Sequence, residues 1–220
     1  LRRMIKPPQE RKLERRRQRQ GGLGRIQPLA VLFADMRNFT PITEANPAFD
    51  VIYILNRYFT TLERAISAHG GRVNLCVGDE ISAVFGLEED PRVACRQAVD
   101  AALQMIDTLA VLSKAVSTEF GVELSIGVGV HFGPVIVGMV GPANDLKLGL
   151  VGDCVNVASR LQAATRHTGD AVLVSSSVAE LLEPSRYRLG ALQELDLKGV
   201  KTKVQGHAVL GHAADPEQPA

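Results

Sequence analysis

Two β-prone runs, residues 72–76 and 80–86, follow one another directly and are joined by a Gly-Asp-Glu corner. Apolar residues recur at helical spacing before them, over 48–68, and after them, over 90–117. Two successive strands between two helices exclude the strict strand–helix alternation of a doubly wound parallel sheet. With a strand before the first helix and another after the second, the order is β-α-β-β-α-β. We therefore predict an α+β fold with a ferredoxin-like core.

The remaining elements follow from the same patterns. The run "PLAVLFAD" is apolar throughout, as is typical of a buried strand, and it ends at Asp35. After the core, helices and strands are appended toward the C-terminus. The pattern predicts two strands within 122–141 broken at Gly133-Pro134, a helix over 153–167, a strand over 171–174, a short helix over 176–182, and strands over 188–197 and 203–210.

The charge is unevenly distributed along the 220 residues. Residues 1–19 carry nine Lys or Arg against two Glu, a net charge of +7, whereas the remainder has a net charge of −6. We read 1–28 as a basic connector, 29–211 as one folded domain and 212–220 as a disordered tail. A mildly acidic body is not typical of a nucleic-acid binder, so no nucleic-acid partner is expected.

Cysteine usage and hydropathy bear on the compartment. The three cysteines are an odd number without metal-like spacing, which favours a reducing compartment over a disulfide scaffold. No apolar run reaches the length of a membrane span and no signal peptide is visible, so we expect a cytoplasmic domain whose parent chain could be membrane-attached. Because the sequence begins at Leu1 and not at Met, we expect it to be a piece of a longer protein.

Two aspartates occupy comparable places in the predicted sheet. Asp35 ends the first strand and Asp79 lies at the hairpin corner. In a ferredoxin-like sheet this strand and this hairpin are neighbours, so the two carboxylates can converge at one edge. Adjacent carboxylates repel unless cations lie between them, and hard oxygen ligands suit Mg²⁺ or Mn²⁺ held jointly with substrate phosphates. Ordinary turn chemistry explains Asp79 equally well on its own.

A third segment, "LVGDCVNVASRL" at 150–161, places Asn156 and Arg160 four residues apart on one helix face. Arginine suits the charge spread over phosphoryl oxygens. An exposed helix with ordinary polar residues would explain either residue singly, but it fits the whole string poorly.

Five segments occur in order at plausible spacings: "VLFADMRNFT", "VGDEISAVFG", "GVGVHFGPVIVGMVG", "VGDCVNVASRL" and "LDLKGV". Together they resemble the catalytic domain of class III nucleotidyl cyclases, the adenylyl and guanylyl cyclases, from about residue 29 to 210. The stretch "LRRMIKPPQERKL" resembles the connector that precedes such domains in multidomain cyclases, which implies an upstream sensory or regulatory domain.

The resemblance implies a homodimer with active sites in clefts between the subunits. Asp35, Asp79 and the carbonyl of Met36 match the ligands of two divalent metal ions, Mg²⁺ or Mn²⁺, per active site. Asn156 and Arg160, from the other subunit, match the residues that position the ribose and stabilise the transition state. A phosphate-binding lysine of the family is matched by Lys198.

Two positions of the base pocket depart from the family. Adenylyl cyclases usually carry Lys at the position of Leu75 and Asp or Thr at that of Gly149, whereas guanylyl cyclases carry Glu and Cys. Neither residue present offers a side-chain hydrogen bond to a purine, so we expect weak base discrimination. The leading hypothesis is an adenylyl cyclase that converts ATP to cyclic AMP and pyrophosphate. The alternatives are a guanylyl cyclase and a degenerate nucleotide-binding or dimerisation module.

Overall fold

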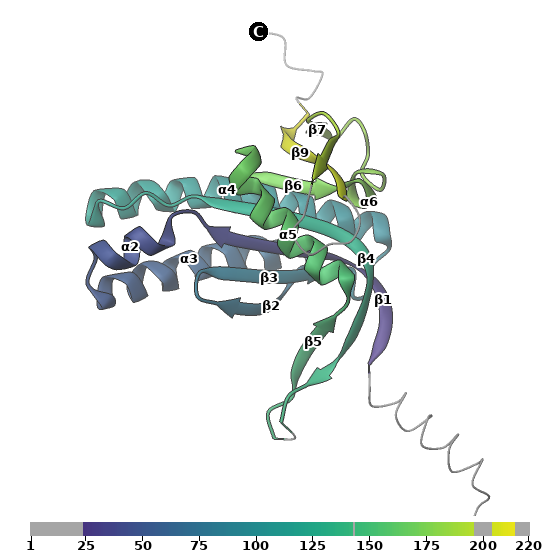
Figure 1. The fold of residues 1–220 in the computed structure, drawn as a ribbon, viewed down its shortest axis with the longest axis horizontal. Coiled ribbons are helices and arrows are strands. Elements are labelled where there is room, and N and C mark those ends of the chain that lie inside the picture. The colour runs from purple at the N-terminus through teal and green to yellow at the C-terminus, as the bar shows by residue number, and fades with distance from the viewer. Residues whose placement is uncertain (1–23, 143, 196–203, 214–220) are drawn as a thin grey trace, which may run out of the picture.

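A computed structural model describes residues 24–142, 144–195 and 204–213 (Figure 1). In chain order its elements are β1 (Arg25–Met36), α2 (Phe39–Ala45), α3 (Ala48–Ala68), β2 (Arg72–Val77), β3 (Glu80–Phe85), α4 (Pro91–Phe120), β4 (Ile126–Val140), β5 (Lys147–Val151), α5 (Asp153–Thr168), β6 (Val172–Ser175), α6 (Ser176–Ala179), β7 (Tyr187–Leu189), β8 (Gln193–Leu195) and β9 (Val204–His212).

The described strands form one sheet in the order β2-β3-β1-β4-β6-β9-β7, with β5 on β4 and β8 on β9. The first four strands have the ferredoxin-like order, and each is antiparallel to its neighbour. The helices α3 and α4 make the two crossovers, and the appended β6 lies parallel to β4. The predicted α+β fold with a ferredoxin-like core is therefore confirmed.

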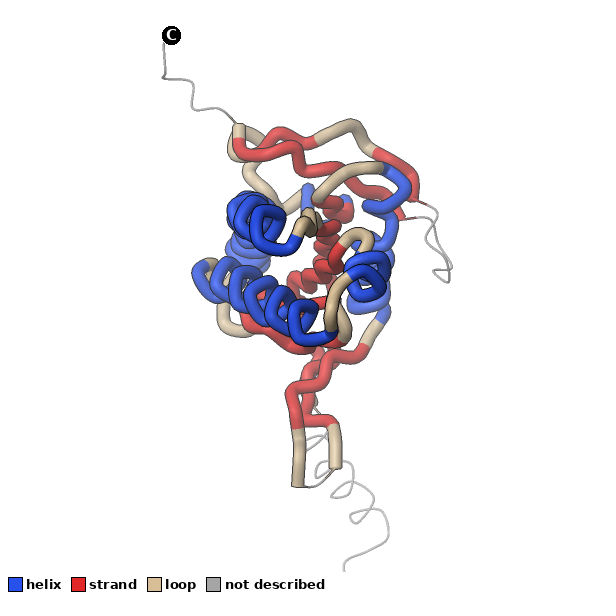
Figure 2. The backbone as a smooth tube through the Cα atoms, turned by 90° about the vertical axis from the view of Figure 1, so that its left-hand side faces the viewer, coloured by secondary structure: helices blue, strands red, loops and turns tan. Residues whose placement is uncertain are grey.

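Residues 29–34 of β1 are all apolar because both faces of the sheet are covered there. Successive side chains of a strand point to opposite faces of the sheet. One alternate set packs in the core with α3 and α4: Ala30, Leu32, Ala34 and Met36. The other set packs with Cys154 and Ala158 of α5: Leu29, Val31 and Phe33. The sheet thus lies between two layers of helices (Figure 2).

The prediction that Gly133-Pro134 breaks the fourth strand is wrong. Strand β4 runs unbroken through both residues, and Pro134 lies opposite Pro28 of β1. On its other side, β4 pairs with β6 at 128–130 and with β5 from 136, so no described strand requires a hydrogen-bond donor from Pro134. A proline is tolerated at such an unpaired position.

Several element boundaries also differ from the sequence expectation. Strand β1 begins at Arg25, within the stretch assigned to the connector, and β9 extends to His212, the first residue of the expected tail. The helix α2 and the strand β5 were not predicted. The strand expected over 188–197 is two short strands, β7 and β8, which both pair with β9.

The end of β4 and the strand β5 form a two-stranded arm that projects from the body (Figure 1). Several apolar side chains of this β4–β5 arm are exposed: Ile136, Met139, Val140, Leu146 and Val151. Among residues 24–142, 144–195 and 204–213, no helix is long and apolar enough to cross a membrane.

Candidate active site

The structure brings Asp35 and Asp79 to the same end of the sheet. Strand β1 pairs with β3 so that Ala34 lies opposite Ile81, and both aspartates come just beyond this pair. Gly78 forms the corner with φ +60°, in the left-handed region that favours glycine. The buried hydroxyl of Tyr58 donates a hydrogen bond of 3.0 Å to the carbonyl of Asp79. The predicted convergence of the two carboxylates is confirmed.

This end of the sheet concentrates negative charge. The pKa of Asp79 is raised to about 6, first by burial and then by its hydrogen bond with Asp35 and the repulsion between the two carboxylates. The backbone hydrogen bond of Asp79 and the charge of Arg166 lower this pKa by smaller amounts. Burial and the charge of Asp35 also raise the pKa of Glu80. Burial, with smaller contributions from both aspartates, raises the pKa of Tyr58. The site therefore favours a positive charge beside its carboxylates.

A residue that the sequence reasoning missed provides such a charge. Arg166, in the last turn of α5, has its Nη2 atom 2.5 Å from Oδ2 of Asp35 and 3.3 Å from the carbonyl oxygen of Met36. No local motif marks this arginine, because 131 residues separate it from Asp35. Only the packing of α5 against β1 reveals the contact.

The donor atoms at this end suit a hard divalent cation. Two carboxylates and one backbone carbonyl are oxygen ligands of the kind that Mg²⁺ accepts, with phosphate and water oxygens completing its shell. The guanidinium of Arg166 already lies where a cation would neutralise Asp35. Within the described ranges there is no cluster of three or more His, Cys, Asp or Glu that could hold a metal alone. A metal here would therefore complete its shell with oxygen atoms from outside these side chains, such as those of water or of the substrate.

Asn156 and Arg160 lie elsewhere along α5. Both are exposed, and in the part of the chain that the structure describes neither side chain makes a hydrogen bond or ion pair. The start of α5 lies near the start of β1, since Sγ of Cys154 is 3.9 Å from the carbonyl of Leu29. At 1.5 Å per residue, Asn156 is about 15 Å along the helix from Arg166, which contacts Asp35. Arg160 is about 9 Å along the helix from Arg166 and faces another side of it, so neither Asn156 nor Arg160 contacts the carboxylates of its own chain.

The two predicted base-pocket residues are on different strands. Leu75, on β2, is 52% exposed, and Gly149, on β5, pairs with Gly138 in the β4–β5 arm. A Cβ atom at Gly149 would lie 2.4 Å from Cγ2 of Val140, so the arm as folded has no room for a side chain there. The predicted phosphate ligand Lys198 lies outside the described residues.

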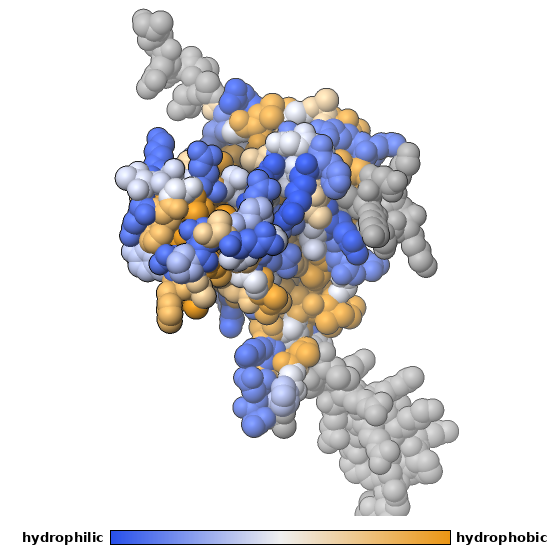
Figure 3. Space-filling model, turned by 60° about the vertical axis from the view of Figure 1, so that its left-hand side comes forward, coloured by the Kyte–Doolittle hydropathy of each residue, from blue (hydrophilic) through white to orange (hydrophobic). Residues whose placement is uncertain are grey.

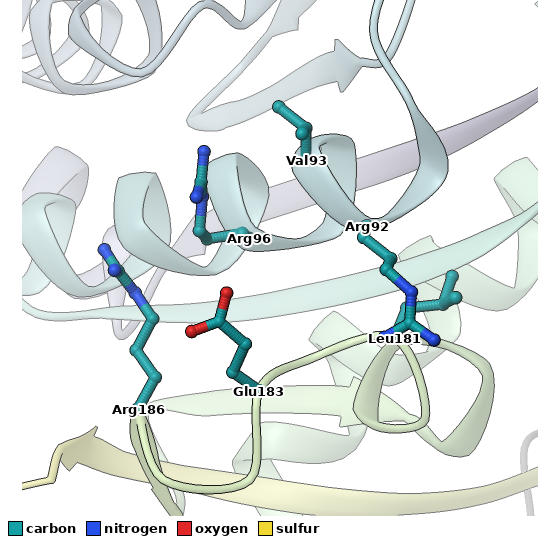
Figure 4. Close-up of a pocket in the computed structure, with 6 residues that line it drawn as sticks. All are labelled: Arg92, Val93, Arg96, Leu181, Glu183 and Arg186. Carbon is teal, nitrogen blue, oxygen red and sulfur yellow. The ribbon is translucent and has the colours of Figure 1, made fainter.

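A separate cavity of about 100 Å³ lies between the start of α4 and the segment from α6 to β7. Arg92 and Arg96 approach it from α4, and Glu183 and Arg186 from the other side (Figure 4). Arg186 is held by the buried carboxylate of Asp100 at 2.9 Å. None of the predicted site residues lines this cavity, so it is distinct from the carboxylate site.

The fold and the paired carboxylates define a class of protein. A family model for the adenylate and guanylate cyclase catalytic domain matches residues 23–211. The chain therefore belongs to this family, the class III nucleotidyl cyclases, and the resemblance of its sequence motifs is confirmed.

Among curated proteins, the chain is similar to an adenylate cyclase from Anabaena cylindrica, with 31% identity over 193 residues. That match covers 86% of this chain and 37% of the Anabaena protein. Adenylate cyclase 1 of Rhizobium meliloti is 28% identical over 186 residues, which are 84% of this chain and 28% of that protein. The chain thus spans less than half the length of these relatives.

Solved structures of both activities share the fold. The crystal structure of a guanylyl cyclase has a TM-score of 0.80 and 28% identity, covering 88% of this chain and 96% of its own. The adenylyl cyclase CyaB from P. aeruginosa also has a TM-score of 0.80, covering 89% and 98% of the two chains. Its identity is 24%, so that similarity bears on the fold alone.

Proposed function

We propose that this chain is the catalytic domain, over residues 29–211, of an adenylyl cyclase, a lyase that converts ATP to 3′,5′-cyclic AMP and pyrophosphate. Its active sites lie between the two subunits of a homodimer, and an upstream sensory or regulatory domain controls them. The relatives named adenylate cyclases support ATP as the substrate. Their greater length supports the presence of further domains.

The observation that carries the proposal is the separation of two half-sites on one chain. Asp35, Asp79 and the Met36 carbonyl meet at one end of the sheet, whereas Asn156 is about 15 Å away along α5. Groups that act on one phosphoryl transfer must surround the same reacting atoms within a few ångströms. A second copy of the chain can supply the missing half, which supports a site shared between subunits.

Exposed apolar surface supports the dimer. Leu75 and Val77 of β2 are exposed next to the carboxylate corner, and the β4–β5 arm exposes further apolar side chains. Figure 3 shows apolar surface on the lower part of the body, where the arm leaves it. Surfaces of this kind commonly mark contacts between proteins.

Each half-site has a distinct task in the proposed reaction. Asp35, Asp79 and the Met36 carbonyl would hold Mg²⁺ or Mn²⁺, two ions per site. When bound, these ions would make the ribose 3′-hydroxyl more nucleophilic and offset the charge of the departing pyrophosphate. Asn156 orients the ribose. Arg160 and Lys198 donate hydrogen bonds to the phosphate oxygens on which charge develops as the 3′-oxygen attacks the α-phosphorus in line.

Guanylyl cyclase activity is the second candidate. The solved guanylyl cyclase at 28% identity favours it. Leu75 offers no polar group to either purine, and Gly149 has no side chain at all. We therefore propose that this domain discriminates weakly between ATP and GTP.

Product identification tests the proposal. The 220-residue chain is incubated with Mn²⁺ and either ATP or GTP, and the products are separated and identified by mass spectrometry. Asp35→Ala serves as the control. Cyclic AMP from ATP supports the adenylyl cyclase, and cyclic GMP alone would identify a guanylyl cyclase. Equal background from the wild type and Asp35→Ala would leave only a nucleotide-binding or dimerisation module.

A further inference from the structure

Arg166 occupies an unusual position for a residue outside the predicted catalytic set. One nitrogen atom, Nη2, contacts both Oδ2 of Asp35 and the carbonyl oxygen of Met36, at 2.5 Å and 3.3 Å. These are two of the three groups that the proposed function assigns to the metal ions. Asp35 is largely buried, with 18% of its side chain exposed, whereas 51% of the Arg166 side chain is exposed.

Stability alone gives a poor account of this contact. An ion pair with a half-exposed partner contributes little to the free energy of unfolding, because solvent screens it and both side chains lose conformational freedom. The same contact has a direct consequence for cation binding. A guanidinium beside Asp35 offsets the charge that would attract a divalent ion, and it repels that ion at short range.

We propose that Arg166 is a resident cation of the metal site, which holds Asp35 and the Met36 carbonyl in place and competes with the divalent ion for them. This inference rests on the proposed function, since it assumes that the metal binds at Asp35 and Asp79. Arg166 is thus a positioning residue that sets a threshold for metal binding. Because its side chain is half exposed, it can swing into solvent when the ion enters without leaving a buried charge unpaired.

Binding of Mn²⁺ alone, without nucleotide, tests the inference. Free Mn²⁺ is measured by electron paramagnetic resonance while the 220-residue chain is titrated. Arg166→Gln should bind Mn²⁺ roughly tenfold more tightly than the wild type, because one positive charge beside the ion is removed. Arg166→Lys keeps the charge and should bind like the wild type. Arg57→Gln is the matched control: it also breaks an Arg–carboxylate pair, with Glu119 at 3.0 Å, and should leave Mn²⁺ binding unchanged.

Thermal unfolding supplies a second readout. In EDTA, Arg166→Gln should unfold close to the wild-type temperature, because the half-exposed pair contributes little to stability. Mn²⁺ should raise the unfolding temperature of Arg166→Gln more than that of the wild type. Circular dichroism verifies that each variant is folded. Equal or weaker Mn²⁺ binding by Arg166→Gln would overturn the inference.

Asp35→Ala separates the failure of this inference from that of the proposed function. If Asp35→Ala loses Mn²⁺ binding while Arg166→Gln matches the wild type, the metal site stands and the role of Arg166 is refuted. If Asp35→Ala binds Mn²⁺ as the wild type does, the metal lies elsewhere and both proposals fail.

Discussion

A mixture of two inactive variants, Asp35→Ala and Arg160→Ala, should regain cyclase activity if each active site takes residues from both subunits. Asp35→Ala removes a ligand from the carboxylate half-site, and Arg160→Ala removes the donor from the other half. Each variant alone should lose about a hundredfold or more in rate, the usual cost of removing one charged transition-state contact.

The size of the recovery follows from the symmetry of the dimer. Random exchange of subunits makes about half of the dimers mixed, and each mixed dimer has one intact site out of two. Activity should therefore return to about a quarter of the wild-type value at equal total protein. If each active site were instead built within one chain, every site of a mixed dimer would carry one of the two changes and no activity would return.

The assay measures the rate of product formation after the variants are mixed and exchanged, with mixed dimers quantified by native mass spectrometry. A mixture of Asp35→Ala with Asp79→Ala is the matched control, because both changes damage the same half-site and no mixed dimer has an intact site. If mixed dimers of Asp35→Ala and Arg160→Ala form but stay inactive, the shared site is refuted. Recovery in the control mixture would refute the assignment of both aspartates to one half-site.

Three further predictions concern individual side chains. Burial lowers the pKa of His131 to about 4, so the folded state binds fewer protons than the unfolded state between about pH 4 and 6.5. As the pH falls through this window, the free energy of unfolding measured in urea should decrease by up to about 3 kcal/mol in the wild type but not in His131→Asn. Equal decreases in both proteins would contradict this assignment to His131. Gly149→Ala should lower the free energy of unfolding in urea by about 1–3 kcal/mol, because the new methyl group clashes with Val140. Adding Val140→Ala to the same chain should restore the lost stability. If Gly149→Ala alone is as stable as the wild type, the arm adapts and the clash is refuted. Tyr58→Phe removes the hydrogen bond to the carbonyl of Asp79, so the free energy of unfolding should fall by about 1 kcal/mol. The Mn²⁺ concentration needed for half-maximal activity should rise, because the Asp79 corner is held less firmly. An unchanged Mn²⁺ requirement would argue against a role of Tyr58 in positioning Asp79.

Much of the ferredoxin-like core could be predicted because its signals are local. Apolar spacing within a single segment distinguishes α3 and α4 from the strands between them. The Gly-Asp corner identifies the hairpin, and a hairpin between two crossovers leaves few possible strand orders. The convergence of Asp35 and Asp79 followed from that order alone, because β3 adds directly to β1.

The errors arose where the outcome depends on a partner strand. Gly133-Pro134 looks like a strand break, yet β4 continues because Pro134 faces Pro28 and has no described strand on its other side. Strand β5 has too few apolar residues in regular alternation to be recognised, and it exists as the partner of β4 in the arm.

By itself, the sequence determined the family, the order of the core elements and the two aspartates that meet at the sheet end, because periodicity and motif spacing act over short stretches of chain. The tertiary structure alone decided that Arg166 reaches Asp35 and that Asn156 does not. Both side chains are on one helix, and the packing of α5 along β1 selects which end of that helix meets the carboxylates. No local pattern encodes that choice, since it depends on contacts between segments more than a hundred residues apart.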